Sequence, residues 1–428
     1  MSLAWNGGLE GVTLIVEAAL STATSSYGIW NAGLWDTATW GPDVAWTDIS
    51  PWVRSITTDR GFSRDVQVWE GGTATITLLN PDGRFSPSNL TGPVKPYVVA
   101  GVTGLRPWRP IRVRATHLGV TYDIYRGYAL DWLETWDPSD AVATVTVPCS
   151  DEMSRLAKFD GLAQSPVGAG ESTGARMHRI LDNAGHTGAR SIDVGRNTVQ
   201  ATDLAKNCVD ELKLTTDSEA GGLFIDGDGT VVFERQYALM ENARSNSVQA
   251  TFVDDNNAGL GLPMADATMS YGSDLVRNIV AFARVGSTQQ LAVDATSRAL
   301  YGDLRESRTD LVCETDAQVQ ALATFYLQLH KDPENRVKQI VVKPRTPPTA
   351  AMWPAVLGRR VRDLIKVIRS PRTGSYTITQ YCHIAGIKHE ITSDDWTTTF
   401  QLWSATVYQT YATSRWDVGA FDSAAFFF

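Results

Sequence analysis

Residues 170–174, Gly-Glu-Ser-Thr-Gly, have the GxSxG spacing that carries the nucleophile of many serine hydrolases. In those enzymes the serine lies on a sharp turn between a strand and a helix. A helix is expected after Ser172, but residues 164–169 contain Pro and Gly and are typical of a loop. We therefore interpret Ser172 or Thr173 as the N-cap of that helix and not as a nucleophile.

The segment Asp226-Gly227-Asp228-Gly229 begins like a calcium-binding loop. An EF-hand loop needs a Glu at its twelfth position, where this chain has Tyr237. We therefore predict that the segment is the tight turn of a β-hairpin between residues 222–225 and 230–234.

Histidines and cysteines are too scattered along the chain to form a metal site. His383 and His389 are expected on one strand, six residues apart, which is too far for one ion. His389-Glu390 lacks the second His of a zinc protease, and no phosphate-binding loop ending in GK[ST] occurs. The four cysteines show no CxxC spacing. We expect no catalytic residue, no metal and no cofactor.

Acidic residues beside aromatic rings leave one enzymatic hypothesis open. Glycosidases use a pair of carboxylates, and flat aromatic rings often line their sugar sites. Glu134, Asp137 and Asp140 lie near Trp132 and Trp136, so they are candidates for such a site. In a chain with 47 acidic residues such neighbours also arise by chance, and a turn at the rim of a domain is the favoured interpretation.

A basic cluster stands out in this acidic chain. No aromatic residues are interleaved with it as a stacking platform for nucleic acid. Pairing with acidic neighbours in an oligomer, or a solvated strand face, is therefore favoured over nucleic-acid contact. The cluster consists of Arg359, Arg360, Arg362, Lys366, Arg369 and Arg372.

Composition narrows the classes of protein further. The 428 residues are long enough for several domains, and the net charge of −9 argues against a general nucleic-acid binder. The first twenty residues lack a basic start and contain Glu10 and Glu17, so neither a signal peptide nor an anchor is expected. No apolar run approaches the roughly 20 residues of a membrane span. We expect synthesis in a cytoplasm-like compartment.

Two strand-rich regions are expected to enclose a helical middle. In residues 73–78 Thr alternates with Ala, Ile and Leu, which predicts a half-buried strand, and the turn at 80–83 predicts a hairpin over 73–87. The spacing of apolar residues then changes from two to about 3.6, which predicts helices that begin near Ser172 and Thr202. A long helix is expected over about 315–331. The fold class is therefore β-rich α+β, with two small antiparallel β-barrels flanking helical and α+β domains. The expected units are an arm (1–45), a first barrel (46–149), an α+β domain (150–240), a mixed domain partly completing the second barrel (241–350), a second barrel (351–406) and an arm (407–428).

The two arms are rich in aromatic residues at a spacing near five, which fits neither a helix nor a strand face. Such segments cannot bury their rings alone, so we expect them to dock onto neighbouring subunits, with packing against the first barrel as the alternative. The candidate docking residues are Trp30, Trp35, Trp40, Trp46, Trp416 and Phe421.

The order of these units resembles the tail hub proteins of tailed bacteriophages. The likeness is carried by WTDISPWVRSITTDRG, GGTATITLLNPDGRFSP, the pair PWRPIRVRA and YDIYRGYALDW, SEAGGLFIDGDGTVVFER, VDATSRALYGDLRE and SYTITQYCHIAGIKHEITSDDWTTTFQLW. These segments span about 46–406. The nearest group is similar to the minor tail proteins of long-tailed (siphovirus-type) phages that infect actinobacteria.

This resemblance implies a non-enzymatic homotrimer at the tail tip of the virion. Each subunit would contribute two barrels to a pseudo-sixfold ring, the baseplate hub, that joins the sixfold tail tube to a threefold tip. The implied partners are distal tail and tail tube proteins, the tape measure protein and other minor tail proteins, with DNA passing through without sequence-specific binding. Because the chain ends at Phe428, soon after the last barrel, cell-wall digestion and receptor recognition are expected of other proteins.

Two alternatives stay open. One is the hexameric distal tail ring protein of the same particles. The other is a carbohydrate-binding or glycoside-cleaving tail protein that uses the Trp-rich segments.

Overall fold

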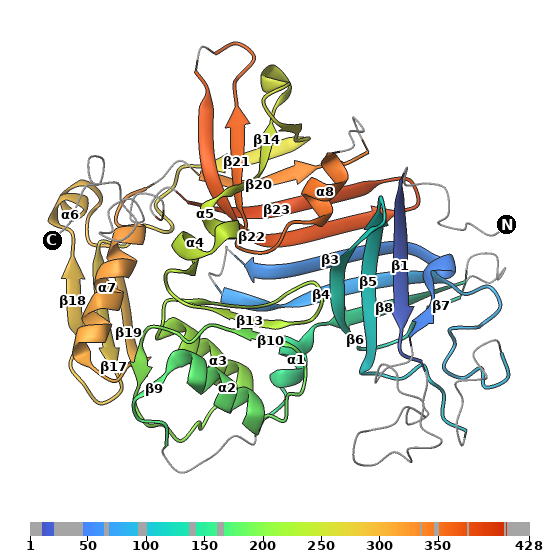
Figure 1. Ribbon diagram of the computed structural model, residues 1–428, viewed down its shortest axis with the longest axis horizontal. Coiled ribbons are helices and arrows are strands. Elements are labelled where there is room, and N and C mark those ends of the chain that lie inside the picture. Colours follow the sequence, from blue (N-terminus) through green and yellow to red (C-terminus); the bar gives the residue numbers. More distant parts are fainter. Residues whose placement is uncertain are drawn as a thin grey trace.

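The computed structural model describes residues 11–20, 46–63, 68–92, 101–136, 143–160, 167–333, 336–345, 351–374, 376–405 and 408. Most of these residues are in strands, which form one sheet of 15 strands and three small sheets, with short helices between them (Figure 1). The β-rich α+β class expected from the sequence is confirmed. Among the described helices, none combines the length and apolar character that crossing a membrane requires.

The first β unit is one half of the large sheet, where consecutive neighbours pair antiparallel in the order β3-β4-β8-β6-β5-β1-β2. Along its strands every second side chain points into the core, as in β5, where Ile111, Val113 and Ala115 are fully buried. The strands are β1 (Val12–Ala18), β2 (Thr47–Asp48), β3 (Val53–Ser63), β4 (Val68–Leu79), β5 (Arg109–His117), β6 (Val120–Ala129), β7 (Leu133–Thr135) and β8 (Thr144–Ser150).

β1 corrects the expected boundary of the N-terminal arm. All seven of its residues pair antiparallel with β5, and Val12, Leu14 and Val16 are buried in the core of the first β unit. The physical reason is the apolar alternation of residues 12–18, which fits a strand with one buried face. The first β unit therefore begins within residues 1–45.

The hairpin expected over residues 73–87 is a second correction. The alternation is confirmed, because Ala74, Ile76 and Leu78 are buried. However, β4 pairs with β3 and β8, and the described residues 80–92 after the turn form no strand. The side chain of Asn80 is buried, and its Oδ1 accepts a hydrogen bond from the backbone N–H of Phe85 at 2.8 Å. This bond folds the chain inward, so that Phe85 enters the core.

The second β unit is the other half of the large sheet and has its own apolar core. It includes strands from the region expected to complete the second barrel, since β14 pairs with β21, and β20 pairs with β23. The described pairings form a branched sheet without a closed circuit. Its strands are β14 (Val248–Val253), β15 (Leu262–Pro263), β16 (Asp266–Ser270), β20 (Arg336–Val342), β21 (Leu364–Arg369), β22 (Ile378–Thr392) and β23 (Trp396–Ser404).

A seam joins the two β units, formed by the antiparallel pairing of Ser55–Gly61 in β3 with Gly386–Thr392 in β22. Gly61 has φ +118, and a Cβ there would lie 2.4 Å from the carbonyl oxygen of Ala385. Only glycine permits both this backbone conformation and this close approach. Helix α8 (Met352–Leu357) contributes residues to both cores: Trp353 to the first and Met352 to the second.

The α+β unit packs below the large sheet in Figure 1. Helix α2 (Thr173–Asn183) and helix α3 (Cys208–Asp217) bury Met177, Ile180 and Leu212 in a core shared with its small sheet. The predicted start of the second of these helices near Thr202 is wrong, because Asn207 caps α3 and accepts a hydrogen bond from the N–H of Asp210. The remaining elements are α1 (Glu152–Leu156), β9 (Glu171–Ser172), β10 (Arg190–Ile192), β11 (Thr198–Val199), β12 (Gly222–Ile225), β13 (Val231–Glu234), α4 (Ala238–Glu241) and α5 (Ala243–Asn246).

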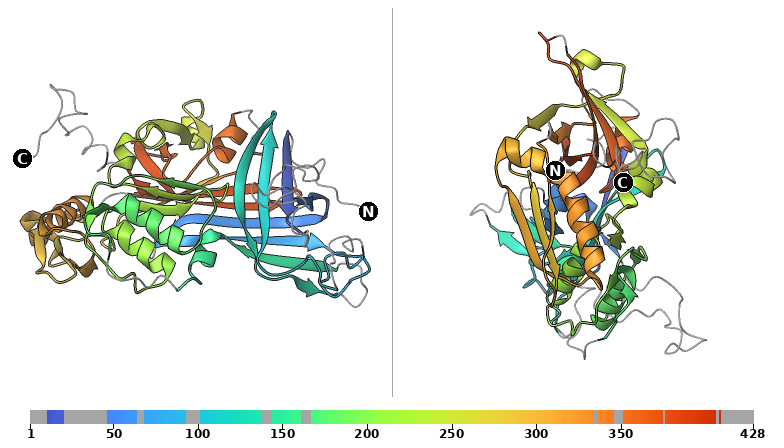
Figure 2. Two further views of the ribbon diagram at one scale, coloured as in Figure 1. Left: turned by 60° about the horizontal axis from the view of Figure 1, so that its bottom comes forward. Right: turned by 90° about the vertical axis from the view of Figure 1, so that its left-hand side faces the viewer.

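A peripheral unit at one end of the molecule has a separate core (Figures 1 and 2). The long helix expected over about 315–331 is confirmed as α7 (Asp316–His330), which packs on the sheet β18-β17-β19. Thr315 and Gln318 form a capping box at its start. The other elements are β17 (Ile279–Arg284), β18 (Gln290–Val293), α6 (Ala295–Tyr301) and β19 (Arg305–Leu311).

Candidate functional site

Trp46 is the one candidate docking residue of the arms that lies among the described residues. Its ring is half-buried beneath the guanidinium of Arg112, whose Cζ lies 4.2 Å from the ring centre. Arg112 also pairs with Glu17 at 2.7 Å, so the ring is fastened to the β1–β5 edge. At this position the structure shows packing onto the chain's own first β unit. Trp30, Trp35, Trp40, Trp416 and Phe421 lie outside the described residues.

Of the two tryptophans in the carbohydrate hypothesis, Trp132 lies in the core and Trp136 lies at the surface. Trp132 is buried and stacks on Phe85 with ring centres 6.5 Å apart, so its face is not open to a sugar. Glu134 accepts a hydrogen bond from the hydroxyl of Ser86 at 2.8 Å. Trp136 is 56 % exposed, and Asp137 and Asp140 lie outside the described residues.

Ser172 caps a helix, as the sequence predicted. Its Oγ accepts a hydrogen bond from the N–H of Ala175 at 3.2 Å, and α2 begins at the next residue. The two residues before α2 form a short strand, β9, that pairs with β11. No hydrogen bond between Ser172 and a histidine occurs among the described residues, so the GxSxG spacing here has a capping role.

Three histidines, His330, His383 and His389, are held in their neutral form. Burial lowers the pKa of His330 and of His383 to about 4 and that of His389 to about 3. His383 is hydrogen-bonded to the carbonyl of Ser245 at 2.9 Å, and His389 to the hydroxyl of Thr398 at 2.9 Å. In the part of the chain that the structure describes, no group of His, Cys, Asp and Glu is placed to hold a metal ion.

The predicted turn at Asp226–Gly229 does join β12 and β13, which pair antiparallel, and it has a structural role that the sequence did not reveal. Asp226 lies between Arg60 of β3, at 2.9 Å, and Arg360 of the loop before β21, at 3.4 Å. Burial opposes ionisation of Asp226, but the two guanidinium groups outweigh it and lower its pKa. The turn therefore connects the α+β unit to both β units.

The basic cluster pairs with acidic neighbours, as favoured from the sequence, but these neighbours belong to the same chain. Arg362 lies 2.6 Å from Glu234 of β13, and Arg359 lies 3.6 Å from Asp363. The carboxylate of Asp363 also accepts hydrogen bonds from Nε and Nη2 of Arg244, at 2.7 and 2.5 Å. We call this group the charged junction: Arg60, Asp226, Glu234, Arg244, Arg359, Arg360, Arg362 and Asp363. Lys366, Arg369 and Arg372 lie farther along β21 and its turn, outside the junction.

Sequence reasoning missed four members of the junction: Arg60, Glu234, Arg244 and Asp363. Residue 234 was predicted only as the end of a hairpin strand. Arg60 and Arg244 lie more than a hundred residues from Asp226 and Asp363, their respective partners, and no local spacing signals such pairs. A signal was present for Asp363, which lies four residues after Arg359 within the basic cluster.

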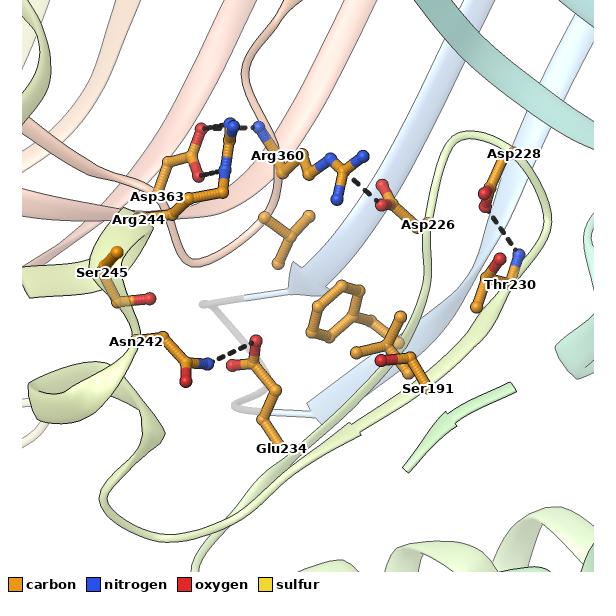
Figure 3. A pocket seen from close by; sticks show the side chains of 14 residues that line it. Ser191, Asp226, Asp228, Thr230, Glu234, Asn242, Arg244, Ser245, Arg360 and Asp363 are labelled. Carbon is orange, nitrogen blue, oxygen red and sulfur yellow. Dashed lines mark hydrogen bonds and ion pairs between the residues drawn. The ribbon is translucent and has the colours of Figure 1, made fainter. Parts of the chain in front are cut away.

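A cavity of about 410 Å³ opens beside the charged junction (Figure 3). Its apolar wall includes Phe224, Val232 and Val361, and its charged rim includes Asp228 and Glu234. Figure 3 shows Arg360 directed at Asp226 and Glu234 directed at Asn242 across the cavity. The described lining contains no His, Cys or Lys, so it offers neither a nucleophile with its base nor a nitrogen ligand set. This arrangement is suited to holding three units together.

The sequence matches no family model and no curated protein. The fold does match solved structures. The 43 kDa tail protein of prophage MuSo2 from Shewanella oneidensis is 12 % identical with a TM-score of 0.55, over 92 % of this chain and 99 % of that chain. The tail protein from Neisseria meningitidis MC58 is 13 % identical with a TM-score of 0.58, over 93 % and 98 % of the two chains.

The chain therefore has the fold of phage tail proteins over nearly its whole length. The structural match shows a shared architecture, but identities of only 12 and 13 % do not carry over the role of any single residue.

Proposed function

We propose that this protein is a non-enzymatic structural component of a phage tail, located in the tail tip of the virion. The observation that supports the proposal best is the pair of β units, each with its own core, that are joined edge to edge through the seam. Such a subunit supplies two neighbouring wall segments in one rigid piece. The shared fold of two solved tail proteins supports the same role.

In this proposal the protein is a homotrimeric hub. Three copies with two wall segments each form a pseudo-sixfold ring, which joins a sixfold tail tube to a threefold tip. The ring contacts distal tail and tail tube proteins, the tape measure protein and other minor tail proteins, and DNA passes through it without sequence-specific binding. A long-tailed phage of actinobacteria is the proposed source, on the sequence resemblance.

The number of copies tests the hub proposal. Native mass spectrometry of the purified protein, together with counting copies per virion, should give three. Six copies would indicate the distal tail ring protein instead. A stable monomer that is absent from virions would refute both.

The aromatic arms are proposed to dock onto neighbouring subunits. The ring of Tyr408 packs against Phe325 and His383, with ring centres 6.4 and 5.6 Å apart. The chain is therefore held to the subunit at Tyr408, 20 residues before its last residue. Deletion of residues 412–428 should reduce assembly into the ring while leaving the thermal unfolding of the subunit unchanged. Normal assembly of the truncated chain would contradict the docking role. Residues 1–45 are unsuited to the same test because they include β1.

A further inference from the structure

Aromatic rings and cations form a row at the boundary between the first β unit and the α+β unit. Nζ of Lys158 lies 4.3 Å from the ring centre of Trp108, and the ring centres of Trp108 and Tyr128 are 6.0 Å apart. Cζ of Arg155 lies 5.6 Å from the ring centre of Tyr128. The two rings are half-buried, whereas Arg155 and Lys158 are exposed, so the row reaches solvent. We call these four residues, together with the exposed Arg106 two positions before Trp108, the basic aromatic patch.

The backbone of Trp108 is held in an unfavourable conformation. Its φ is +63, in the left-handed region that bulky side chains rarely adopt. Its N–H donates a hydrogen bond to the carbonyl of Ala129 at 2.7 Å, which holds the backbone in place. Strained residues are concentrated where the position of a side chain serves a function, so this strain points to a contact made by the Trp108 ring.

Positive charge in the patch is only partly balanced. Arg155 has a counter-charge in Glu152, with Nε and Oε1 3.7 Å apart. Arg106 and Lys158 form no ion pair with any described residue, and neither does Asp160, which follows Lys158 by two positions. Two exposed cations are therefore open to an acidic partner.

The C-terminal arm has the complementary chemistry. After Arg415 it contains two acidic residues, Asp417 and Asp422, and no Lys or Arg. Phe421 directly precedes Asp422, and a ring beside a carboxylate matches a ring beside a cation, because the rings pack together and the opposite charges attract. The other such pair, Trp416-Asp417, follows Arg415, whose charge the patch repels. Phe421-Asp422 is therefore the better match.

We propose that the basic aromatic patch receives the C-terminal arm of a neighbouring copy, with Phe421 against Trp108 and Asp422 beside Lys158. The proposal rests on the ring proposed above and names the surface that the arm contacts. The arm starts at Tyr408, which packs on α7 at one end of the molecule, whereas the patch lies away from that end, beside α1 and β6 (Figure 1). The chain from Tyr408 to Asp422 spans up to about 46 Å when extended, so it can cross to an adjacent copy. Contact between two different surfaces is head-to-tail, and such contacts close into a ring when the rotation between copies allows it.

Zero-length cross-linking tests the contact directly. A carbodiimide joins an amine to a carboxylate only where the two groups meet, so it should link Nζ of Lys158 to the carboxylate of Asp422. The sample is assembled from full-length chains with and without a heavy-nitrogen label, mixed in equal amounts. Mass spectrometry should find linked peptides that combine a labelled and an unlabelled chain.

The other outcomes of this experiment overturn the proposal in different ways. Links within one chain only would mean that the arm packs on its own subunit. A trimer in native mass spectrometry without the link would leave the ring in place and remove the docking surface. A chain that stays monomeric would refute the ring and the docking surface with it.

Charge reversal is a second test, measured as the concentration at which half of the chains are assembled. Lys158→Glu should raise this concentration about tenfold, because an attraction becomes a repulsion at each contact, and Asp422→Lys in the same chain should restore it. Lys206→Glu is the matched control, because Lys206 is exposed and lies outside the patch, and it should assemble like the wild type. Equal weakening by Lys158→Glu and Lys206→Glu, or no rescue by Asp422→Lys, would overturn the proposal.

Discussion

The seam between the two β units should be broken by adding a single methyl group. Gly61 has φ +118, and a Cβ at this position would lie 2.4 Å from the oxygen of Ala385 and 2.8 Å from Cα of Gly386. Real Cβ atoms do not approach backbone so closely, so Gly61→Ala must separate β3 from β22 locally. The strained backbone alone costs about 1–3 kcal/mol, and we expect a total near 3 kcal/mol once the clash is included.

Hydrogen exchange measures this loss where it occurs. A loss of about 3 kcal/mol accelerates exchange through local opening by about 150-fold, at 1.36 kcal/mol per factor of ten. Amides of Ser55–Gly61 and Gly386–Thr392 should show this acceleration, whereas those of β17 and α7 should not. Assembly of the proposed ring should weaken as well, because the two β units are no longer held in register.

Gly119→Ala is the matched control. Gly119 also has a positive φ, +80, but a Cβ there would meet nothing within 4 Å, so the variant carries the backbone strain without the clash. The reasoning is refuted if Gly61→Ala accelerates exchange at the seam no more than Gly119→Ala accelerates it in the β5–β6 turn.

Three further predictions concern charge and capping. Because His330, His383 and His389 have lowered pKa values in the folded chain, their contribution to stability is complete above about pH 6.5 and falls as the pH drops toward 4. Burial raises the pKa of Asp151 to about 7, which acts in the opposite direction. These four groups together should cost roughly 3 kcal/mol of stability on going from pH 7 to pH 5, and urea midpoints that do not change over this range would contradict this. Asp226→Asn should cost about 3–5 kcal/mol by leaving Arg60 without its counter-charge, whereas Asp228→Asn in the same turn should cost under 1 kcal/mol in the same urea titration. Thr315→Ala should cost about 1 kcal/mol by removing the cap of α7, and Thr324→Ala on the exposed face of that helix should cost nothing; equal losses would contradict the capping role.

Local physics made several elements predictable. Alternation in residues 73–78 and 111–115 determined which side chains are buried, because a strand places successive residues on opposite faces. The helical spacing after Thr315 determined α7 and its cap, and the Asp-Gly-Asp-Gly turn determined the β12–β13 hairpin. In each case the interactions lie within a few residues of one another.

Pairing between distant segments was not predictable from these patterns. Residues 73–79 alternate equally well whether β4 pairs with a following strand or, as it does, with β3 and β8. Alternation along a strand indicates that one of its faces is buried, but it does not indicate which other strand pairs with it. For the same reason the sequence placed β1 in an arm, although its seven residues pair with β5.

The sequence by itself determined that the chain is a β-rich α+β protein, along with the turn at Asp226–Gly229 and the basic cluster near Arg359. The tertiary structure alone decided that the turn and the cluster meet, since the attraction of Asp226 for Arg60 and Arg360 depends on a distance that only folding sets. It also decided that the two β units share a seam. Charges and alternation are local properties, whereas a junction among three units exists only once the sheet has brought them together.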